Sequence, residues 1–201
     1  DQVDDDQNGY VDDFVGYDFV DHDGLPYDRH GAGTAMAGII GAVADNGVGI
    51  RGIAPEISLL PVRFIDGSGQ FKFPNLVSSI EYAVKMKADL IVLHLPSYTF
   101  KPSNAKVEKA MVAEVLKKVD AAALPIVVSA GSSGLNLSKG EDLLTALRLS
   151  SNVIAVTSID KNEARPAIAN FGRAAVETAA PGEAVLSTAP GNSYQELSST
   201  S

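Results

Sequence analysis

Short apolar segments alternate with helical patterns over most of the chain, and this alternation limits the possible folds more than any other feature. The segments that we expect to be buried strands are residues 58–64, 90–95, 126–128 and 153–156. Parallel strands need long crossover connections, and helices are the usual crossovers. The pattern therefore predicts an α/β fold with a doubly wound parallel sheet and helices on both faces.

Helical periodicity fills the gaps between these segments. Pro74 favours a helix start, and apolar residues then share one face: Leu76, Ile80, Ala83 and Val84. A second helix is predicted over residues 104–122, with an apolar stripe that we expect to be core: Val107, Met111, Val115 and Val119. A helical turn is predicted at 142–147, and the last forty residues read as short strands and turns.

The length of 201 residues and the hydrophobic content of 45% suit one sizeable core. We therefore expect a single domain over residues 1–201. The absence of cysteine excludes disulfides and thiolate metal sites, and no apolar run reaches membrane-spanning length. The chain starts abruptly and without a signal-peptide pattern, so we expect a fragment of a longer protein.

The formal net charge of −9 is concentrated at the start of the chain. Residues 1–28 contain ten Asp and neither Lys nor Arg, whereas the remainder carries 16 basic and 15 acidic residues. The acidity is local and needs a local explanation. Because no basic patch is present, nucleic acid is not an expected partner.

Within this acidic segment, oxygen side chains recur at alternate positions around a glycine, as in the first nine positions of an EF-hand-like calcium loop. The glycine, Gly9, permits the sharp bend. The predicted calcium ligands are Asp4, Asp6, Asn8, the carbonyl of Tyr10, and Asp12. The last loop position, where a glutamate is expected, is Val15, so Asp13 or a later Asp would have to close the shell. The alternative is a solvated acidic loop.

A run of small residues at 29–38 (Arg-His-Gly-Ala-Gly-Thr-Ala-Met-Ala-Gly) predicts a helix entry that something approaches closely. The run resembles the histidine motif of the subtilisin-like serine proteases, or subtilases. Further segments resemble the same family in order, which extends the resemblance over nearly the whole chain: residues 49–55, 89–93, 128–131, 179–182 and 197–201.

The family's chemistry needs a serine, a histidine base, an aspartate and an oxyanion donor. By the resemblance, Ser201 matches the nucleophile, but the histidine position is Ala32 and the oxyanion asparagine position is Ser132. The aspartate motif would precede residue 1, and the helix that follows the nucleophile would come after residue 201. Loss of the histidine costs about 10⁶-fold in turnover in subtilisin, so the resemblance implies an inactive homologue, a pseudoprotease.

Substrate-binding residues also follow from the resemblance and from the position of sites beyond the carboxyl ends of parallel strands. His94, Leu95 and Pro96 match the strand that pairs with a substrate backbone, and Ala130 and Gly131 belong to the opposite rim. Proline has no N–H, so at least one pairing hydrogen bond is absent at Pro96.

Three functional hypotheses remain open. The leading one is an inactive subtilase domain, a calcium-stabilised scaffold that binds a peptide or protein partner. The second is an active endopeptidase that uses a displaced histidine such as His30. The third is a purely structural module of a larger secreted protein. The family and the calcium loop favour an extracellular or envelope location, and the sequence leaves the oligomeric state open.

Overall fold

The computed structural model describes residues 3–140 and 142–200, and the chain divides into two compact units. One unit holds the chain up to Ser79 together with Leu186–Glu196. The other holds Ile80–Val185 and the residues from Leu197 onward. The expected single domain over residues 1–201 stays a prediction.

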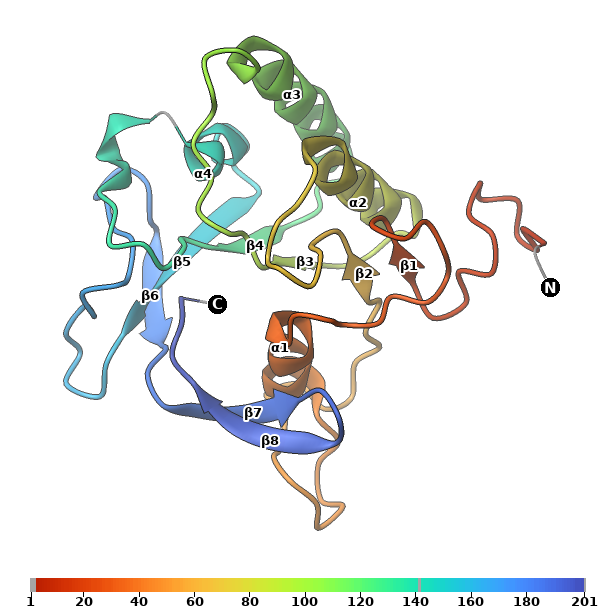
Figure 1. The fold of residues 1–201 in the computed structure, drawn as a ribbon, viewed down its shortest axis with the longest axis horizontal. Helices are drawn as coiled ribbons and strands as arrows, with labels where there is room; N and C mark the ends of the chain where they lie inside the picture. Colours follow the sequence, from red (N-terminus) through yellow and green to blue (C-terminus); the bar gives the residue numbers. More distant parts are fainter. Residues whose placement is uncertain (1–2, 141, 201) are drawn as a thin grey trace. The chain divides into compact units, whose positions relative to one another are not determined.

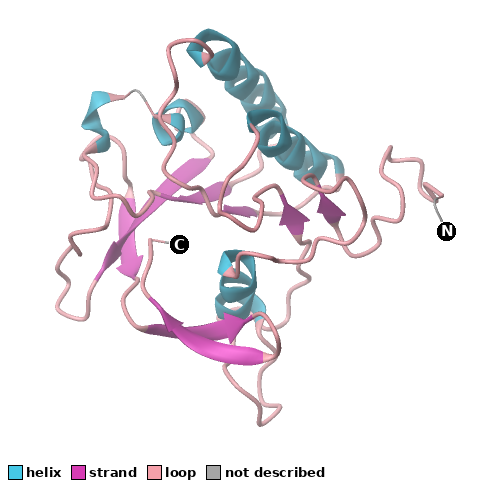
Figure 2. Ribbon diagram, in the orientation of Figure 1, coloured by secondary structure: helices cyan, strands magenta, loops and turns pink. Residues whose placement is uncertain are grey.

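The first unit contains few regular elements and much loop (Figure 2). Its elements are β1 (Tyr17–Asp18), α1 (Ala32–Gly41), β2 (Val62–Arg63), the start of α2 (Phe73–Lys85), and most of β7 (Val185–Ala189) and β8 (Ser193–Leu197). Strands β1 and β2 pair in parallel. A tight turn joins β7 to β8, and its residues Gly191 and Asn192 have φ values of 79° and 55°. Such positive φ values match the twist of a two-stranded hairpin.

The second unit is built on a parallel sheet of four strands in the order β3-β4-β5-β6 (Figure 1). Its elements along the chain are β3 (Ile91–Leu93), α3 (Ala105–Ala121), β4 (Ile126–Ser129), the 3₁₀ turn η1 (Leu137–Lys139), α4 (Leu143–Leu147), β5 (Val153–Ile159) and β6 (Thr178–Pro181). The predicted α/β fold with a parallel sheet is confirmed. Figure 1 shows α3 and α4 on one side of this sheet.

The core of the second unit is formed by alternate residues of its strands. Ile126 and Val128 of β4 are at most 1% exposed, and Ala155 of β5 is fully buried. The apolar side of α3 faces inward through Val112, Val115, Leu116 and Val119. The predicted stripe on this helix is therefore partly wrong: Val107 is 64% exposed, because the buried face runs through the position after it, Glu108.

The predicted buried strand over residues 58–64 is also wrong in extent. Only Val62–Arg63 pairs, and Ser58, Leu59 and Leu60 are exposed within loop residues 42–61. Pro61 has no N–H to donate to a neighbouring strand, although its carbonyl accepts from Tyr17 N at 3.2 Å.

Other expectations agree with the structure. Helix α2 has Pro74 as its second residue, and Leu76, Ile80 and Ala83 are buried on it. Helix α4 begins after Asp142, whose carboxylate accepts from the Thr145 N–H at 2.9 Å, a typical N-cap. Among the described residues, no helix is both long and apolar enough to cross a membrane.

Candidate functional site

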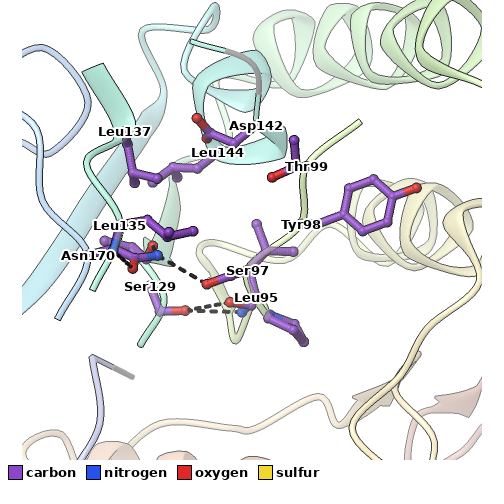
Figure 3. Close-up of a pocket in the computed structure, with 12 residues that line it drawn as sticks. Leu95, Ser97, Tyr98, Thr99, Ser129, Leu135, Leu137, Asp142, Leu144 and Asn170 are labelled. Carbon is purple, nitrogen blue, oxygen red and sulfur yellow. Dashed lines mark hydrogen bonds between the residues drawn. The ribbon is translucent and has the colours of Figure 1, made fainter. Parts of the chain in front are cut away.

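A pocket lies at the carboxyl ends of β3 and β4 in the second unit (Figure 3). The segments that leave these strands supply its rim, as expected for a parallel sheet. Its lining combines leucine side chains with hydroxyl and amide groups: Leu95, Pro96, Ser97, Tyr98, Thr99, Ser129, Ala130, Leu135, Leu137, Asp142, Leu144 and Asn170.

Asn170 holds the two sides of this pocket together. Its side chain donates to the Ala130 carbonyl at 2.8 Å and to Ser97 Oγ at 3.1 Å (Figure 3). Its Oδ1 accepts the N–H groups of Ser133 at 3.0 Å and Leu135 at 2.8 Å. At 1% exposure, Asn170 is a buried amide with all four hydrogen bonds made by protein. The sequence analysis missed it, because it lies in an irregular segment far along the chain from both strands.

Gly131 is required by this network. It has a φ of +90°, and a Cβ there would lie 2.6 Å from Ser97 Oγ and 2.7 Å from Asn170 Nδ2. Any side chain would therefore push the two network atoms apart. A second link comes from Ser129, whose Oγ accepts from Leu95 N at 3.1 Å.

The predicted substrate residues fall into two groups. Leu95, Pro96 and Ala130 line the pocket, and Gly131 borders it through its carbonyl, which accepts from Asn170 N at 2.9 Å. His94 is half-buried and is not among the lining residues. The structure thus brings together most of the predicted set.

Tyr98 turns its hydroxyl away from the pocket (Figure 3). The hydroxyl donates to Glu108 Oε1 at 2.9 Å. Burial raises the pKa of Tyr98, and the hydrogen bond to the Glu108 carboxylate raises it further. Tyr98 therefore stays a neutral wall residue, not a proton acceptor at neutral pH.

Ser132 lies next to the end of the chain. Its Oγ is 3.2 Å from Thr200 Oγ1 and 3.4 Å from Ser199 Oγ, and it accepts from Thr200 N at 3.3 Å. The segment that carries these residues is anchored by the Ser199 N–H, which donates to Gly182 O at 2.9 Å. The hydroxyl of Ser132 is thus engaged by its own chain. Ser201 lies outside the described residues.

In the first unit, Ala32 is the first residue of α1, after Gly31 with a φ of 98°. The helix entry is held by Asp28. Its Oδ1 accepts from His30 N at 2.8 Å and Gly31 N at 2.7 Å, and its Oδ2 accepts from Thr34 N and Thr34 Oγ1. Burial alone would raise the pKa of Asp28, but these hydrogen bonds, led by that from Gly31, lower it below its usual value.

Helix α1 packs tightly on β7. Ser187 Oγ donates to Ala35 O at 2.6 Å, and Thr188 Oγ1 donates to Thr34 O at 2.8 Å. A Cβ on Gly38 would lie 2.1 Å from Thr188 Oγ1 and 2.9 Å from Ser187 Oγ. The close approach expected at this small-residue helix is therefore made by β7.

His30 points toward a neighbouring turn. A Cβ on Gly69 would lie 3.2 Å from His30 Nε2, so the imidazole rests against the turn at residues 66–69. His30 therefore packs against this turn at the helix entry.

The acidic loop is closed by its own hydrogen bonds. Asp4 accepts from the N–H groups of Asn8 at 3.0 Å and Gly9 at 2.7 Å. Asn8 Nδ2 donates to Asp6 Oδ2 at 3.0 Å and Asp13 Oδ2 at 2.9 Å. Over residues 3–140 and 142–200, no three His, Asp or Glu side chains gather closely enough to hold a metal ion. The predicted ligand set, including Tyr10 and Asp12, stays a prediction.

Sequence comparison decides the family. The model of the subtilase family, peptidase S8, matches residues 2–201. The chain belongs to the subtilase family. The match of Ala32 to the histidine position and of Ser132 to the oxyanion position is an inference from the sequence resemblance.

Among the relatives of this subtilase is thermitase from Thermoactinomyces vulgaris, 35% identical over 186 residues, with 92% of this chain and 61% of thermitase covered. Subtilisin DY from Bacillus licheniformis is 33% identical, with 92% and 64% covered. The major intracellular serine protease of Bacillus subtilis is 34% identical, with 92% and 56% covered. The chain therefore spans about three fifths of the length of these relatives.

Solved structures show the same fold. A cold-adapted subtilisin-like serine proteinase matches with a TM-score of 0.73 at 22% identity, covering 92% of this chain and 61% of that one. A lanthipeptide protease matches with a TM-score of 0.78 at 22% identity, covering 93% and 61%. The subtilisin-like fold predicted from the sequence is confirmed.

Proposed function

We propose that this subtilase domain does not hydrolyse peptides and instead binds an extended peptide or protein segment at the strand-end pocket. The proposal rests on Ala32, the first residue of α1, which the sequence resemblance aligns with the family's histidine position. A methyl group cannot take the proton of a serine, so the nucleophile remains a weak hydroxyl.

The oxyanion position gives further support. Ser132 is shorter than asparagine, and its hydroxyl is already shared with Ser199 and Thr200. A donor that is bonded within the chain is poorly placed to stabilise a developing oxyanion. Loss of such a donor costs about 10²–10³-fold in turnover, in addition to the loss of the base.

The binding role rests on the pocket. Leu95, Leu135 and Leu137 offer an apolar wall, while Ser97 supplies a polar group at the rim. An apolar side chain carried on an extended backbone suits this combination. Pro96 has no N–H and cannot donate one of the backbone hydrogen bonds to a bound segment. Contacts with the pocket side chains would therefore contribute more to the affinity than backbone hydrogen bonds do.

Calcium is part of the proposal as a stabiliser of the acidic loop. The fit is partial. The carboxylates of Asp6 and Asp13 lie close together, since both accept hydrogen bonds from Asn8 Nδ2. The ligand atoms would be oxygens, which calcium prefers. Asp4, Asp6, Asn8, Tyr10 and Asp12, with Asp13, would hold the ion. Bound calcium would neutralise the carboxylates. A secreted or envelope location goes with this proposal, since weak calcium sites fill outside the cytosol.

A fluorophosphonate probe tests the catalytic part, because it labels only an activated serine. We expect no labelling of Ser201 in the full-length protein. Labelling that disappears in Ser201→Ala would contradict the proposal. In the variant Ala32→His we expect activity at least about 10²-fold below that of an active subtilase, because Ser132 still replaces the oxyanion donor.

Fluorescence anisotropy tests the binding part, with a pool of fluorescein-labelled peptides of random sequence. We expect binding that Leu137→Ala weakens and that Leu149→Ala leaves unchanged, because Leu149 is 80% exposed and lies outside the pocket. Equal affinity in both variants would mean that any binding lies outside the pocket, and absence of binding by the unmodified domain would argue for the structural-module alternative.

A further inference from the structure

Two Asn-Gly pairs occur in the first unit, Asn8-Gly9 and Asn46-Gly47. Both asparagines adopt the same local turn. Asn8 Oδ1 accepts from Tyr10 N at 2.8 Å, and Asn46 Oδ1 accepts from Val48 N at 3.0 Å. In each turn the side-chain carbonyl reaches across the following glycine to the next backbone N–H.

The side-chain amide of an asparagine and the backbone nitrogen of the next glycine are the partners of a spontaneous reaction. The glycine nitrogen loses its proton and forms a bond to Cγ, the Cγ–Nδ2 bond breaks, and Nδ2 leaves as ammonia. Water then opens the five-membered ring to aspartate or isoaspartate. Glycine favours the attack because no Cβ hinders it. The rate depends on how easily the glycine N–H ionises and how freely Nδ2 can leave.

At Asn46 nothing in the structure opposes these steps. Asn46 is exposed, and a Cβ on Gly47 would meet no atom within 4 Å. Throughout the part of the chain that the structure describes, no protein acceptor takes the Gly47 N–H. The nitrogen is therefore free to exchange its proton with water.

At Asn8 both steps are opposed. The Gly9 N–H donates to the Asp4 carboxylate at 2.7 Å, so this hydrogen bond must break before the nitrogen can attack Cγ. The leaving nitrogen, Nδ2, is held by Asp6 and Asp13. Asn8 is also only 7% exposed, which keeps water from the ring.

We propose that Asn46 is a site of spontaneous deamidation and that the Asp4 carboxylate protects Asn8 from the same reaction. The modified loop has a structural role. Its Gly49 packs on Tyr194, and just beyond it Gly52 N donates to Ala42 O at 2.9 Å at the end of α1. A new charge or a lengthened backbone at residue 46 therefore arises in the loop that runs from the C-cap of α1, Ala42, to Gly49 and Gly52.

Peptide mapping by mass spectrometry tests the proposal on the intact chain during incubation at mildly alkaline pH. We expect Asn46 to convert at least about tenfold faster than Asn8, the effect of losing a hydrogen bond to a charged acceptor. In denaturant the two rates should approach each other. A ratio that is the same in the folded and denatured chain, or faster conversion of Asn8, would overturn the proposal.

A matched pair of variants isolates the protecting contact. Asp4→Ala should raise conversion of Asn8 at least about tenfold. Asp5→Ala removes the same charge from the neighbouring residue, whose carboxylate makes none of these contacts, and should leave conversion of Asn8 unchanged. Equal acceleration in both variants would show that net charge, and not the Gly9 hydrogen bond, controls the rate.

Discussion

The entry to α1 and the rim of the pocket are both held by one side chain that gathers several backbone groups, but the two side chains differ in charge. Asp28 accepts hydrogen bonds from His30, Gly31 and Thr34 as a carboxylate. Asn170 accepts from Ser133 and Leu135 as a neutral amide. The acidic loop follows the first pattern, with Asp4 and Asp6 as acceptors.

Because of this difference in charge, different conditions should destabilise the two regions. Carboxylate acceptors make stronger hydrogen bonds, but protonation or a competing cation removes them. A neutral amide does not titrate, so its hydrogen bonds do not depend on pH. When it is buried, each of its polar atoms needs a hydrogen-bond partner. The first unit should therefore respond to acid and to calcium, whereas the pocket rim should respond to mutation.

The largest loss of stability should come from a substitution at Asn170, the neutral amide. Asn170→Ala leaves the Ala130 carbonyl and the N–H groups of Ser133 and Leu135 without partners in a buried site. We expect a loss of about 3 kcal/mol in the free energy of unfolding, since each unsatisfied group costs roughly 1–3 kcal/mol. Urea denaturation measures it. Asn170→Asp keeps the acceptor and removes the donor, so a loss as large as that of alanine would show that the donor side dominates.

Removal of calcium should be next in size and confined to the first unit. Binding to the folded loop at a hundredfold excess over Kd would stabilise it by roughly 2.7 kcal/mol. We expect EDTA to increase proteolysis within residues 3–28 and to leave the pocket segments intact. The same cleavage rate with and without calcium would contradict the assignment of a calcium site.

Asp28→Asn should cost about 1 kcal/mol, because an amide nitrogen in place of Oδ2 cannot accept the hydrogen bonds from the Thr34 N–H and hydroxyl. Because the pKa of Asp28 is lowered in the folded chain, its contribution is complete above the unfolded carboxylate pKa and is lost as the pH falls through the lower folded value. The protection of the Thr34 amide against hydrogen exchange, relative to its intrinsic rate at each pH, should fall in acid, while that of the Ser133 amide should not. The asparagine variant, which cannot ionise, should show no acid dependence at Thr34.

The smallest effect should come from Ser132→Ala. Its hydrogen bonds to Ser199 and Thr200 are partly exposed, so we expect a loss of under about 1 kcal/mol. Thermal unfolding measures this value. A much larger loss would mean that the end of the chain depends on Ser132, and would show the pocket region to be more cooperative than the comparison suggests.

The sequence was sufficient for features that depend on local patterns. Apolar periodicity located β3 to β5, α2 and α3, and the strand-end rule located Pro96 and Ala130 at the pocket. Patterns failed where tertiary contacts decide. Val107 has helical spacing to Val115 but lies on the exposed side of α3. Asn170 has no motif, because its partners lie in the segments after β3 and β4, 35 to 73 residues earlier in the chain, and meet it only in the folded unit.

Gly38 has a consequence for how such a domain can diverge. A side chain added at this position would overlap Thr188 and Ser187, so the depth of α1 against β7 is fixed about 1.7 turns away from residue 32. Selection on packing and selection on chemistry therefore act on different residues of the same helix. On the proposed assignment of residue 32 as the histidine position, a proton-transferring group could be lost or regained at the first residue of α1 without moving the helix.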